Sequence, residues 1–97
     1  RSRENVAHHY DLSNDFYRLW LDDDMQYSCA YWPDAVADPG GPPRSALTLE
    51  AAQEAKKAHI AAKLRLEPGQ HILDIGCGWG GMAMYLARHA EVTVHGI

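Results

Sequence analysis

The feature that most constrains this chain is a short apolar run that leads directly into three closely spaced glycines. Residues 72–75, Ile-Leu-Asp-Ile, predict a short strand buried on both faces, as in a parallel sheet. Gly76, Gly78 and Gly80 follow, and they allow a sharp turn with no Cβ to block a ligand. Residues 81–89 then carry apolar and aromatic side chains at helical spacing. Together these elements predict a nucleotide site, because unpaired N–H groups at a helix start point into such a turn.

Two kinds of nucleotide site have this arrangement of strand, turn and helix. Gly76, Gly78 and Gly81 satisfy the G-x-G-x-x-G spacing of dinucleotide sites, which also need an acidic residue at the end of the second strand. The expected second strand, residues 92–97, ends in His-Gly-Ile and has no acid there. Asp74 and the additional Gly80 instead resemble the first motif of S-adenosylmethionine-dependent methyltransferases, whose loop wraps the amino-acid end and sugar of the cofactor. A glycine turn that serves packing alone is the alternative without a ligand.

The chain is short for an α/β domain. It has 97 residues and two convincing strands, whereas such a domain usually has about 100–200 residues. Because a two-stranded parallel sheet cannot cover its own faces, and because the chain begins at Arg1, we expect a piece of a longer enzyme, inactive and poorly folded alone. Residues 1–66 would form an N-terminal helical cap and lid segment. Residues 67–97 would begin a Rossmann-like cofactor-binding domain.

The composition argues against several classes of function. The net charge is −4, and the 13 acidic and 9 basic residues are spread along the chain, so no basic run indicates nucleic acid. No apolar run approaches the ~18 residues of a membrane span, and no signal peptide opens the chain. Cys29 and Cys77 have no metal-ligand spacing and no secretory context. We therefore expect no metal site, and free thiols in a reducing cytosol.

The N-terminal part predicts one short helix followed by a solvated turn. Ser13 is a good N-cap, and the apolar residues Phe16, Leu19 and Trp20 share a helical face that would pack on the domain. Residues 8–10, His-His-Tyr, precede this helix in a polar loop and are only a weak signal of a site. The three aspartates at 22–24 oppose the dipole at the helix C-terminus and predict a solvated turn.

Residues 25–32, Met-Gln-Tyr-Ser-Cys-Ala-Tyr-Trp, form an aromatic segment that is too polar for a core strand and too apolar for an ordinary loop. Aromatic faces attract cations by about 0.5–2 kcal/mol each. Such faces suit a sulfonium, or a carbocation formed during a reaction. An aromatic plug under the N-terminal helix explains the same composition equally well.

One longer helix is expected before the glycine turn. Thr48 can cap it, Glu50 lies in its first turn, and alanines carry it to Leu66 before a Pro-Gly pair breaks the chain. This helix would cover one face of the sheet or the mouth of the cofactor site. A solvated face is the simpler interpretation of its basic residues, although they could touch anionic lipid. These residues are Lys56, Lys57, Lys63 and Arg65.

Four segments, residues 9–16, 25–32, 49–56 and 74–81, form an ordered series that resembles the cyclopropane-fatty-acyl-phospholipid synthase family, which includes the mycolic acid cyclopropane synthases. The resemblance covers most of residues 6–97. Its most specific part is Tyr-Ser-Cys-Ala-Tyr-Trp, far more so than the glycine turn. The Pro- and Gly-rich loop between Pro33 and Arg44 looks longer than in many family members, which affects lid geometry rather than chemistry.

The resemblance implies an α/β fold, a Rossmann-like S-adenosylmethionine-dependent methyltransferase with an N-terminal helical cap, truncated after the second strand. The implied reaction is methyl transfer from S-adenosylmethionine to the cis double bond of an unsaturated fatty acyl chain of a phospholipid. The carbocation then loses a proton from the added methyl, which closes a cyclopropane ring. Family members hold a bicarbonate ion that takes this proton, and Cys29 matches a position beside it.

The resemblance also assigns a cofactor site. Asp74 would order the glycine loop by accepting backbone N–H groups, and residues from the cap would contact the cofactor from the other side. The full set of cofactor-binding residues is Tyr27, Ser28, Leu73, Asp74, Ile75, Gly76, Cys77, Gly78, Trp79 and Gly80.

The implied partners are phospholipid acyl chains at the membrane surface, with no nucleic acid and no transmembrane segment. The resemblance allows a homodimer, and it implies a cytoplasmic protein that is peripheral at the inner face of the membrane. Two other functions stay open. One is a related methyltransferase that closes no ring and makes a branched acyl chain or acts on a small molecule; only residues 27–32 argue against it. The other is an inactive cofactor-domain fragment.

Overall fold

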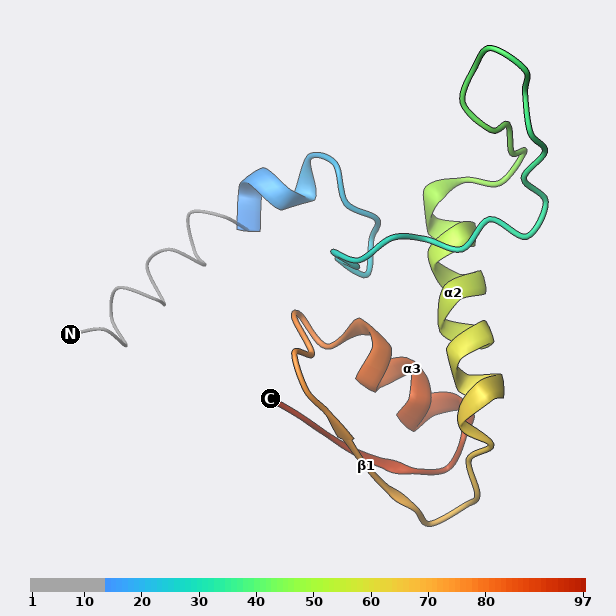
Figure 1. The fold of residues 1–97 in the computed structure, drawn as a ribbon. Coiled ribbons are helices and arrows are strands. Elements are labelled where there is room, and N and C mark those ends of the chain that lie inside the picture. The colour runs from blue at the N-terminus through green and yellow to red at the C-terminus, as the bar shows by residue number, and fades with distance from the viewer. Residues whose placement is uncertain (1–13) are drawn as a thin grey trace.

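A computed structural model of the chain describes residues 14–97. A short helical turn at residues 14–18 is followed by a long irregular segment. The remaining elements are α2 (Leu49–Leu64), β1 (His71–Asp74), α3 (Gly81–His89) and β2 (Thr93–Gly96). Figure 1 shows α3 lying along the strands and α2 rising beside them, with residues 14–48 passing over the top. The predicted helix cap at Ser13 and the histidines at 8 and 9 lie outside the described residues.

The two strands and α3 form a β-α-β unit. β1 and β2 pair in parallel, with Ile72 opposite Val94 and Asp74 opposite Gly96. Parallel strands need a crossover connection, and α3 supplies it. Leu86 of α3 and Val92 before β2 are buried, with 3% and 7% of their surface exposed. This unit agrees with the Rossmann-like α/β fold that the resemblance implies.

The first strand, His71–Asp74, lies one residue earlier than the predicted residues 72–75, and the prediction that it is buried on both faces is wrong. Leu73 is 57% exposed and Ile75 is 75% exposed, whereas Ile72 and Asp74 are half-buried. The reason is that α3 packs on the strands from one side (Figure 1), and none of the described elements covers the other side.

Helix α2 begins as predicted and ends slightly early. The Thr48 hydroxyl accepts a hydrogen bond from the backbone N–H of Ala51 at 3.1 Å, and Glu50 lies in the first turn. The helix ends at Leu64 instead of Leu66, because Arg65 has the left-handed conformation (φ 51°, ψ 51°) that closes many helices. Thr48 therefore caps α2 as expected, and local chemistry at Arg65 sets its end.

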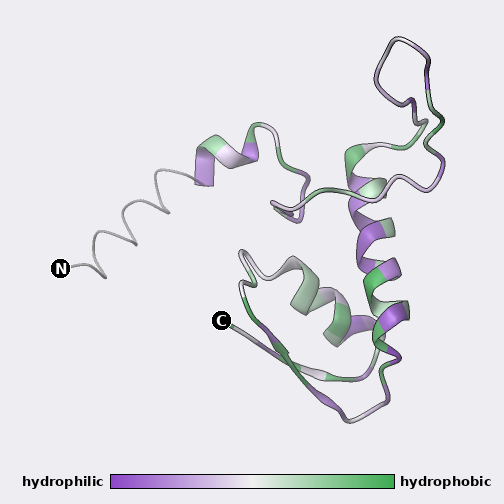
Figure 2. Ribbon diagram, viewed as in Figure 1, coloured by the Kyte–Doolittle hydropathy of each residue, from purple (hydrophilic) through white to green (hydrophobic). Residues whose placement is uncertain are grey.

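The buried face of α2 is polar. It consists of Ala52, Gln53, Lys56 and Lys57, and Figure 2 shows hydrophilic residues along much of the helix. Ile60 and Leu64, by contrast, are 38% and 48% exposed. The prediction of a solvated basic face is therefore wrong for Lys56 and Lys57, because both ammonium groups contact polar partners on the segment before α2.

The N-terminal turn does not bury the apolar face that was predicted to pack on the domain. Phe16, Leu19 and Trp20 are 58%, 82% and 48% exposed. Instead, Tyr17 holds the turn through edge contacts with the rings of Tyr27 and Trp79, each with centroids 5.4 Å apart. Trp20 also lies 6.0 Å from the Tyr27 ring, as the aromatic-plug interpretation predicts.

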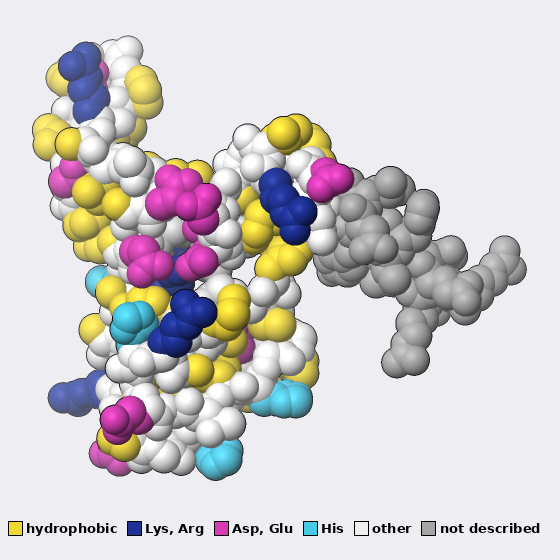
Figure 3. Space-filling model, turned by 180° about the vertical axis from the view of Figure 1, so that it is seen from behind, with side chains coloured by type: hydrophobic (Ala, Val, Ile, Leu, Met, Phe, Trp, Pro, Cys, Tyr) yellow, Lys and Arg dark blue, Asp and Glu magenta, His cyan; other side chains and the backbone are white. Residues whose placement is uncertain are grey.

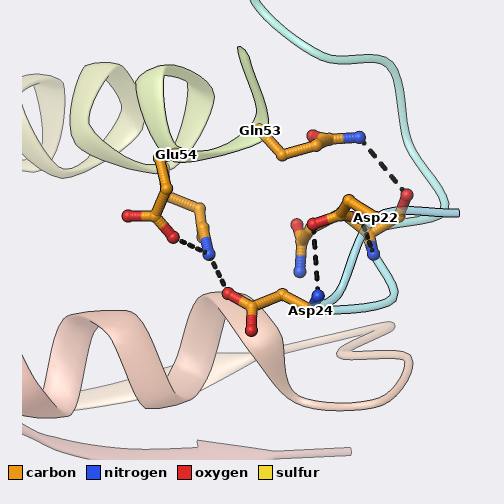
Figure 4. Close-up of polar contacts among 6 residues, drawn as sticks. Asp22, Asp24, Gln53 and Glu54 are labelled. Atoms are coloured by element: carbon orange, nitrogen blue, oxygen red, sulfur yellow. Dashed lines mark hydrogen bonds and ion pairs between the residues drawn. The ribbon is translucent and has the colours of Figure 1, made fainter. Parts of the chain in front are cut away.

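The prediction of a solvated turn at residues 22–24 is wrong for Asp22, which is only 4% exposed. Its carboxylate accepts hydrogen bonds from the backbone N–H groups of Gln26 (2.8 Å) and Asp24 (3.3 Å). Figure 4 shows this turn facing α2, with the Asp24 side chain directed towards Glu54. Asp22 is buried because it satisfies the turn's own backbone, as aspartate often does in such turns.

A substitution at Gly81, the first residue of α3, tests how tightly the turn at residues 22–26 packs on this helix. A Cβ at Gly81 would meet the side-chain amide of Gln26 and lie 2.9 Å from the carbonyl oxygen of Asp24. We expect Gly81→Ala to lower the free energy of unfolding by about 1–3 kcal/mol through overpacking, although alanine normally stabilises a helix relative to glycine. Urea denaturation of the whole protein measures this. A more stable Gly81→Ala protein would show that the turn does not pack here.

Candidate cofactor site

A cavity of about 310 Å3 opens where three distant segments meet. The glycine turn after β1 forms one wall, α2 forms another, and residues 25–28 cross between them. Its lining residues are Met25, Gln26, Tyr27, Ser28, Lys56, Ile60, Asp74, Gly76, Cys77, Gly78, Trp79 and Met82. Ligand pockets usually measure about 300–1,000 Å3, so this cavity can hold at least part of a small molecule.

The glycine turn owes its shape to left-handed backbone. Gly76, Gly78 and Gly80 have φ angles of 74°, 58° and 88°, a region that side chains with a Cβ rarely adopt. A Cβ built on any of the three would meet no atom within 4 Å. The backbone therefore requires glycine for its conformation, and it leaves open space beside the cavity.

The end of β2 fixes the start of this turn. The N–H groups of Gly76 and Cys77 donate to the carbonyl oxygen of Ile97 at 2.9 and 3.1 Å, and the N–H of Ile97 donates to the carbonyl oxygen of Asp74 at 2.9 Å. These two turn N–H groups are thus held by Ile97. The prediction that the Asp74 carboxylate orders the loop by accepting backbone N–H groups is wrong among the described residues, because none of their N–H groups donates to it and its Oδ2 has no partner.

Asp74 brings an unsatisfied acceptor to the cavity wall. Its Oδ2 atom is buried and has no hydrogen-bond partner among the residues that the structure describes. Leaving such an atom without a donor costs about 1–3 kcal/mol. Because Asp74 lines the cavity, a ligand with a hydroxyl or ammonium group could supply the missing donor.

Helix α2 holds residues 26–28 over the cavity through two side chains one turn apart. The Gln53 side-chain amide donates to the carbonyl oxygens of Gln26 (3.3 Å) and Ser28 (3.0 Å), and Figure 4 shows it reaching towards this segment. The Lys56 ammonium donates to the Ser28 hydroxyl at 2.9 Å. Of the two placements expected for this helix, the one at the mouth of the candidate site agrees with the structure, because Lys56 and Ile60 line the cavity.

Lys56 is a nearly buried cation at this site, with 9% of its surface exposed. Burial is the main influence on its pKa and lowers it, while the negative charge of Asp22 acts in the opposite direction. Among the described residues no carboxylate lies within ion-pair distance of its ammonium. The cavity thus contains a positive charge that lacks an immediate counter-ion.

Most of the residues assigned to the cofactor by sequence meet at the cavity, namely Tyr27, Ser28, Asp74, Gly76, Cys77, Gly78 and Trp79. The others do not line it. Leu73 and Ile75 are exposed, and Gly80 is the N-cap of α3. Cys29 is an exposed free thiol outside the lining, next to Ser28.

Sequence analysis missed five lining residues, of which Lys56 carries the most chemistry. The others are Met25, Gln26, Ile60 and Met82. The spacing of Lys56 and Ile60 places them on one face of α2, and Met82 lies in the turn of α3 next to the glycines. These signals were present in the sequence, but nothing in it told which face of α2 meets the glycine turn.

A second, polar cavity of about 200 Å3 lies between α2, α3 and Asp24. Figure 3 views the molecule from behind and shows acidic and basic side chains gathered side by side. The lining consists of Asp24, Glu54, Lys57, Gly81, Met84, Tyr85, Arg88 and His89. Its buried cation, Lys57, pairs with Asp24 and with Glu54, the latter at 2.6 Å.

Neither a metal site nor a membrane span is found in residues 14–97. The described His, Cys, Asp and Glu side chains form no group of three or more that could hold a metal ion. Within the same range, every helix is too short or too polar to cross a membrane.

Comparison with known proteins finds similar sequences among curated cyclopropane synthases. It is 51% identical over 89 residues to the cyclopropane-fatty-acyl-phospholipid synthase of Escherichia coli (strain K12), a match that covers 92% of this chain and 20% of that protein. It is 47% identical over 94 residues to cyclopropane mycolic acid synthase 2 of Mycobacterium leprae, which covers 97% of this chain and 27% of that protein.

Solved structures agree with the sequence comparison. The crystal structure of the mycolic acid cyclopropane synthase CmaA1, complexed with SAH and CTAB, has a TM-score of 0.75 and 44% identity, covering 96% of this chain and 29% of that one. The cyclopropane synthase MmaA2 from Mycobacterium tuberculosis gives a TM-score of 0.74 and 44% identity, covering 90% and 27%. The chain therefore spans less than a third of these relatives. The model of the mycolic acid cyclopropane synthetase family matches residues 1–97, and the chain belongs to that family.

Proposed function

We propose that the whole protein carrying this chain transfers a methyl group from S-adenosylmethionine to the cis double bond of an unsaturated acyl chain in a phospholipid, and closes a cyclopropane ring. The observation that carries the proposal is the cavity between the glycine turn and residues 25–28. Tyr27 and Ser28 at this cavity begin the segment Tyr-Ser-Cys-Ala-Tyr-Trp, which resembles this family most specifically. A relative of 44% identity has been crystallised with SAH, the demethylated form of the same cofactor.

The residues at the cavity fit such a cofactor. The left-handed glycines leave open space beside the backbone, and the unpaired Asp74 Oδ2 can accept a hydrogen bond from a hydroxyl or ammonium group. Bound S-adenosylmethionine would supply an electrophilic methyl group on a sulfonium. Asp74 and the turn would orient the molecule from one wall, and Tyr27 and Ser28 would close over it from the other.

Aromatic rings near the cavity suit a reaction that develops positive charge. Tyr27 and Trp79 line the cavity, and the Tyr17 ring contacts both of them. A neutral alkene is a poor nucleophile, so alignment with the methyl group and stabilisation of the cation determine the rate. Ring faces attract cations by about 0.5–2 kcal/mol each. We propose that this cluster shields and stabilises the cation.

We propose that bicarbonate binds beside Cys29 and takes the proton that closes the ring. An anion needs hydrogen-bond donors, and the backbone N–H of residue 29 is one whatever its side chain. The sequence neighbours of Cys29, Ser28 and Ala30, offer no base, and the nearby cation Lys56 donates its hydrogen bond to the Ser28 hydroxyl. Its role would therefore come from the backbone.

We expect Cys29→Ser in the whole protein to keep activity within about tenfold, or ~1.4 kcal/mol in the barrier. Serine keeps the backbone N–H, and it replaces the thiol with a hydroxyl, which is a much weaker nucleophile at neutral pH. Activity should also rise with added bicarbonate in both proteins. Complete loss in Cys29→Ser with unchanged cofactor affinity, or a covalent adduct on the Cys29 sulfur, would assign catalysis to the thiol instead.

The substrate proposal places the protein at the cytoplasmic face of the membrane, bound peripherally to reach phospholipid acyl chains, and allows a homodimer. Exposed apolar side chains at Phe16, Leu19 and Trp20 support contact with lipid, since apolar and aromatic groups gather at such interfaces. The alternative, methylation without ring closure, uses the same cofactor cavity.

Product analysis separates these functions. The whole protein is incubated with S-adenosylmethionine and a phospholipid that carries a cis-unsaturated chain. We expect the chain to gain one CH2 unit, lose its alkene protons and acquire cyclopropane protons by NMR. A methyl branch or a methylated small molecule would favour the alternative, and absence of any methyl transfer by the folded protein would refute both.

A further inference from the structure

We propose that Lys56 binds the carboxylate at the amino-acid end of the methyl donor, an assignment that rests on the proposed function. The ammonium of Lys56 lies in the α2 wall of the cavity and faces residues 26–28. In this arrangement it forms an ion pair with the ligand, and the Ser28 hydroxyl contacts the same carboxylate.

The hydrogen bonding of Lys56 leaves room for such a ligand. Its ammonium has three N–H donors, and the described residues accept one of them, at Ser28 Oγ. The Ser28 hydroxyl accepts this bond through a lone pair, so its own hydrogen stays available. Two N–H groups and one O–H group can therefore converge on one carboxylate.

Comparison with the neighbouring lysine shows what Lys56 lacks. Lys57 is more deeply buried, at 1% exposed, and its ammonium is paired with the carboxylates of Asp24 and Glu54. Lys56 has no such partner among the described residues. A buried cation is stable only when it is paired, so a carboxylate from the ligand would complete the site.

The charges at the cavity also set the orientation of the ligand. S-adenosylmethionine has a single anionic group, its carboxylate, and several donors on its ribose and ammonium. Lys56 and Asp74 both line the cavity, Lys56 on α2 and Asp74 at the end of β1. The carboxylate is attracted by Lys56 and repelled by Asp74, while donors of the ligand are attracted by Asp74. The two side chains thus favour one direction of binding.

Anionic lipid is a poorer partner for Lys56. The residue is 9% exposed, and its ammonium donates a hydrogen bond to the Ser28 hydroxyl. Lys63, on the last turn of the same helix, is exposed. Binding to a membrane surface would therefore use a lysine such as Lys63, and Lys63 supplies the matched control for Lys56.

The test measures the affinity of the whole protein for three ligands by calorimetry. S-adenosylhomocysteine has the complete amino-acid end, its decarboxylated analogue lacks only the carboxylate, and 5′-methylthioadenosine lacks the whole amino-acid end. We expect Lys56→Met to bind S-adenosylhomocysteine about 10- to 100-fold more weakly than the wild type, the range for a hydrogen bond to a charged group. Its affinity for 5′-methylthioadenosine should change less than about twofold, and Lys63→Met should match the wild type for every ligand.

A cycle between the variant and the decarboxylated ligand isolates the pair. The wild type should bind the decarboxylated ligand about 10- to 100-fold more weakly than S-adenosylhomocysteine. Lys56→Met should bind the two ligands with equal affinity, because it has already lost the partner of the carboxylate. Equal weakening of all three ligands in Lys56→Met would overturn the assignment, because it would indicate a distorted cavity. Equal affinity of the wild type for the complete and decarboxylated ligands would overturn it too, even if the variant failed to fold. Failure of the wild type to bind any of the three would instead refute the proposed function.

Discussion

Replacing Gly78 with valine is expected to remove cofactor binding from the whole protein, with affinity for S-adenosylmethionine reduced at least about 100-fold, or ~2.7 kcal/mol. Two effects combine. Gly78 has a φ of 58°, where a β-branched residue is strained. The position where its Cβ would lie has no protein atom within 4 Å and adjoins the cavity, so the new side chain would fill the ligand's space. Calorimetry measures the affinity.

Gly40→Val separates these two effects. Gly40 also has a left-handed φ, 83°, with open space around its Cβ position, but it lies in the loop before α2 and away from the cavity. The Gly40→Val protein should therefore be destabilised as the Gly78→Val protein is, but it should bind the cofactor with the affinity of the wild type. A folded Gly78→Val protein that binds the cofactor with normal affinity would show that the glycine turn is not the binding element.

The parts of this fold that could be predicted from sequence are those set by neighbouring residues. The glycine turn follows from three residues that tolerate left-handed backbone, and the start of α2 follows from one hydroxyl that caps it. The β-α-β unit follows from the order of its elements. Such features depend on contacts within a few positions along the chain, and the sequence displays these directly.

The parts that could not be predicted depend on pairing between distant segments. Asp24 and Lys57 are 33 positions apart, and Lys56 and Ser28 are 28 apart. Helical spacing alone shows a row of lysines on α2 but not which of them meets an acidic or hydroxyl partner. Because long basic side chains are usually solvated, the solvated interpretation was reasonable, and it failed where the chain brought a turn of aspartates against α2.

The exposed strand face was missed for a related reason. Apolar residues on both sides of β1 indicate that it is buried on both faces when further elements cover the sheet. Among residues 14–97, only the face towards α3 is covered, which leaves Leu73 and Ile75 exposed. The apolar residues of the strand thus show which of its side chains can be buried. Whether they are buried depends on other elements that cover the sheet, and the local sequence does not specify these.

The largest stability effect is expected where Lys57 meets its two carboxylates. Its side chain is 1% exposed, and it pairs with Asp24 and Glu54 and lies 5.6 Å from the centre of the Tyr85 ring. We expect the double variant Asp24→Asn/Glu54→Gln to lower the free energy of unfolding by about 3–5 kcal/mol at neutral pH, because it leaves a buried charge without partners. Denaturation of the whole protein in urea measures the change. The exposed pair of Asp15 and Arg18, 3.5 Å apart, provides the control, and Asp15→Asn should cost under about 0.5 kcal/mol.

The pH dependence should reverse sign in the same variant. In the wild type, burial is the largest influence on Lys57 and lowers its pKa, but hydrogen bonds from its ammonium to Asp24 and Glu54 together raise the pKa above its usual value. The stabilisation from charged Lys57 is therefore complete below about pH 10.4, the pKa of a lysine in the unfolded chain. It is lost as the pH rises through the higher pKa that Lys57 has in the folded protein. Without the carboxylates only burial remains, the folded pKa falls below the unfolded one, and the variant should become more stable as the pH rises towards about 10. Adding Lys57→Met to the double variant removes the charge and should restore most of the stability. A double variant as stable as the wild type, with the same pH dependence, would show that this buried cation does not need its partners.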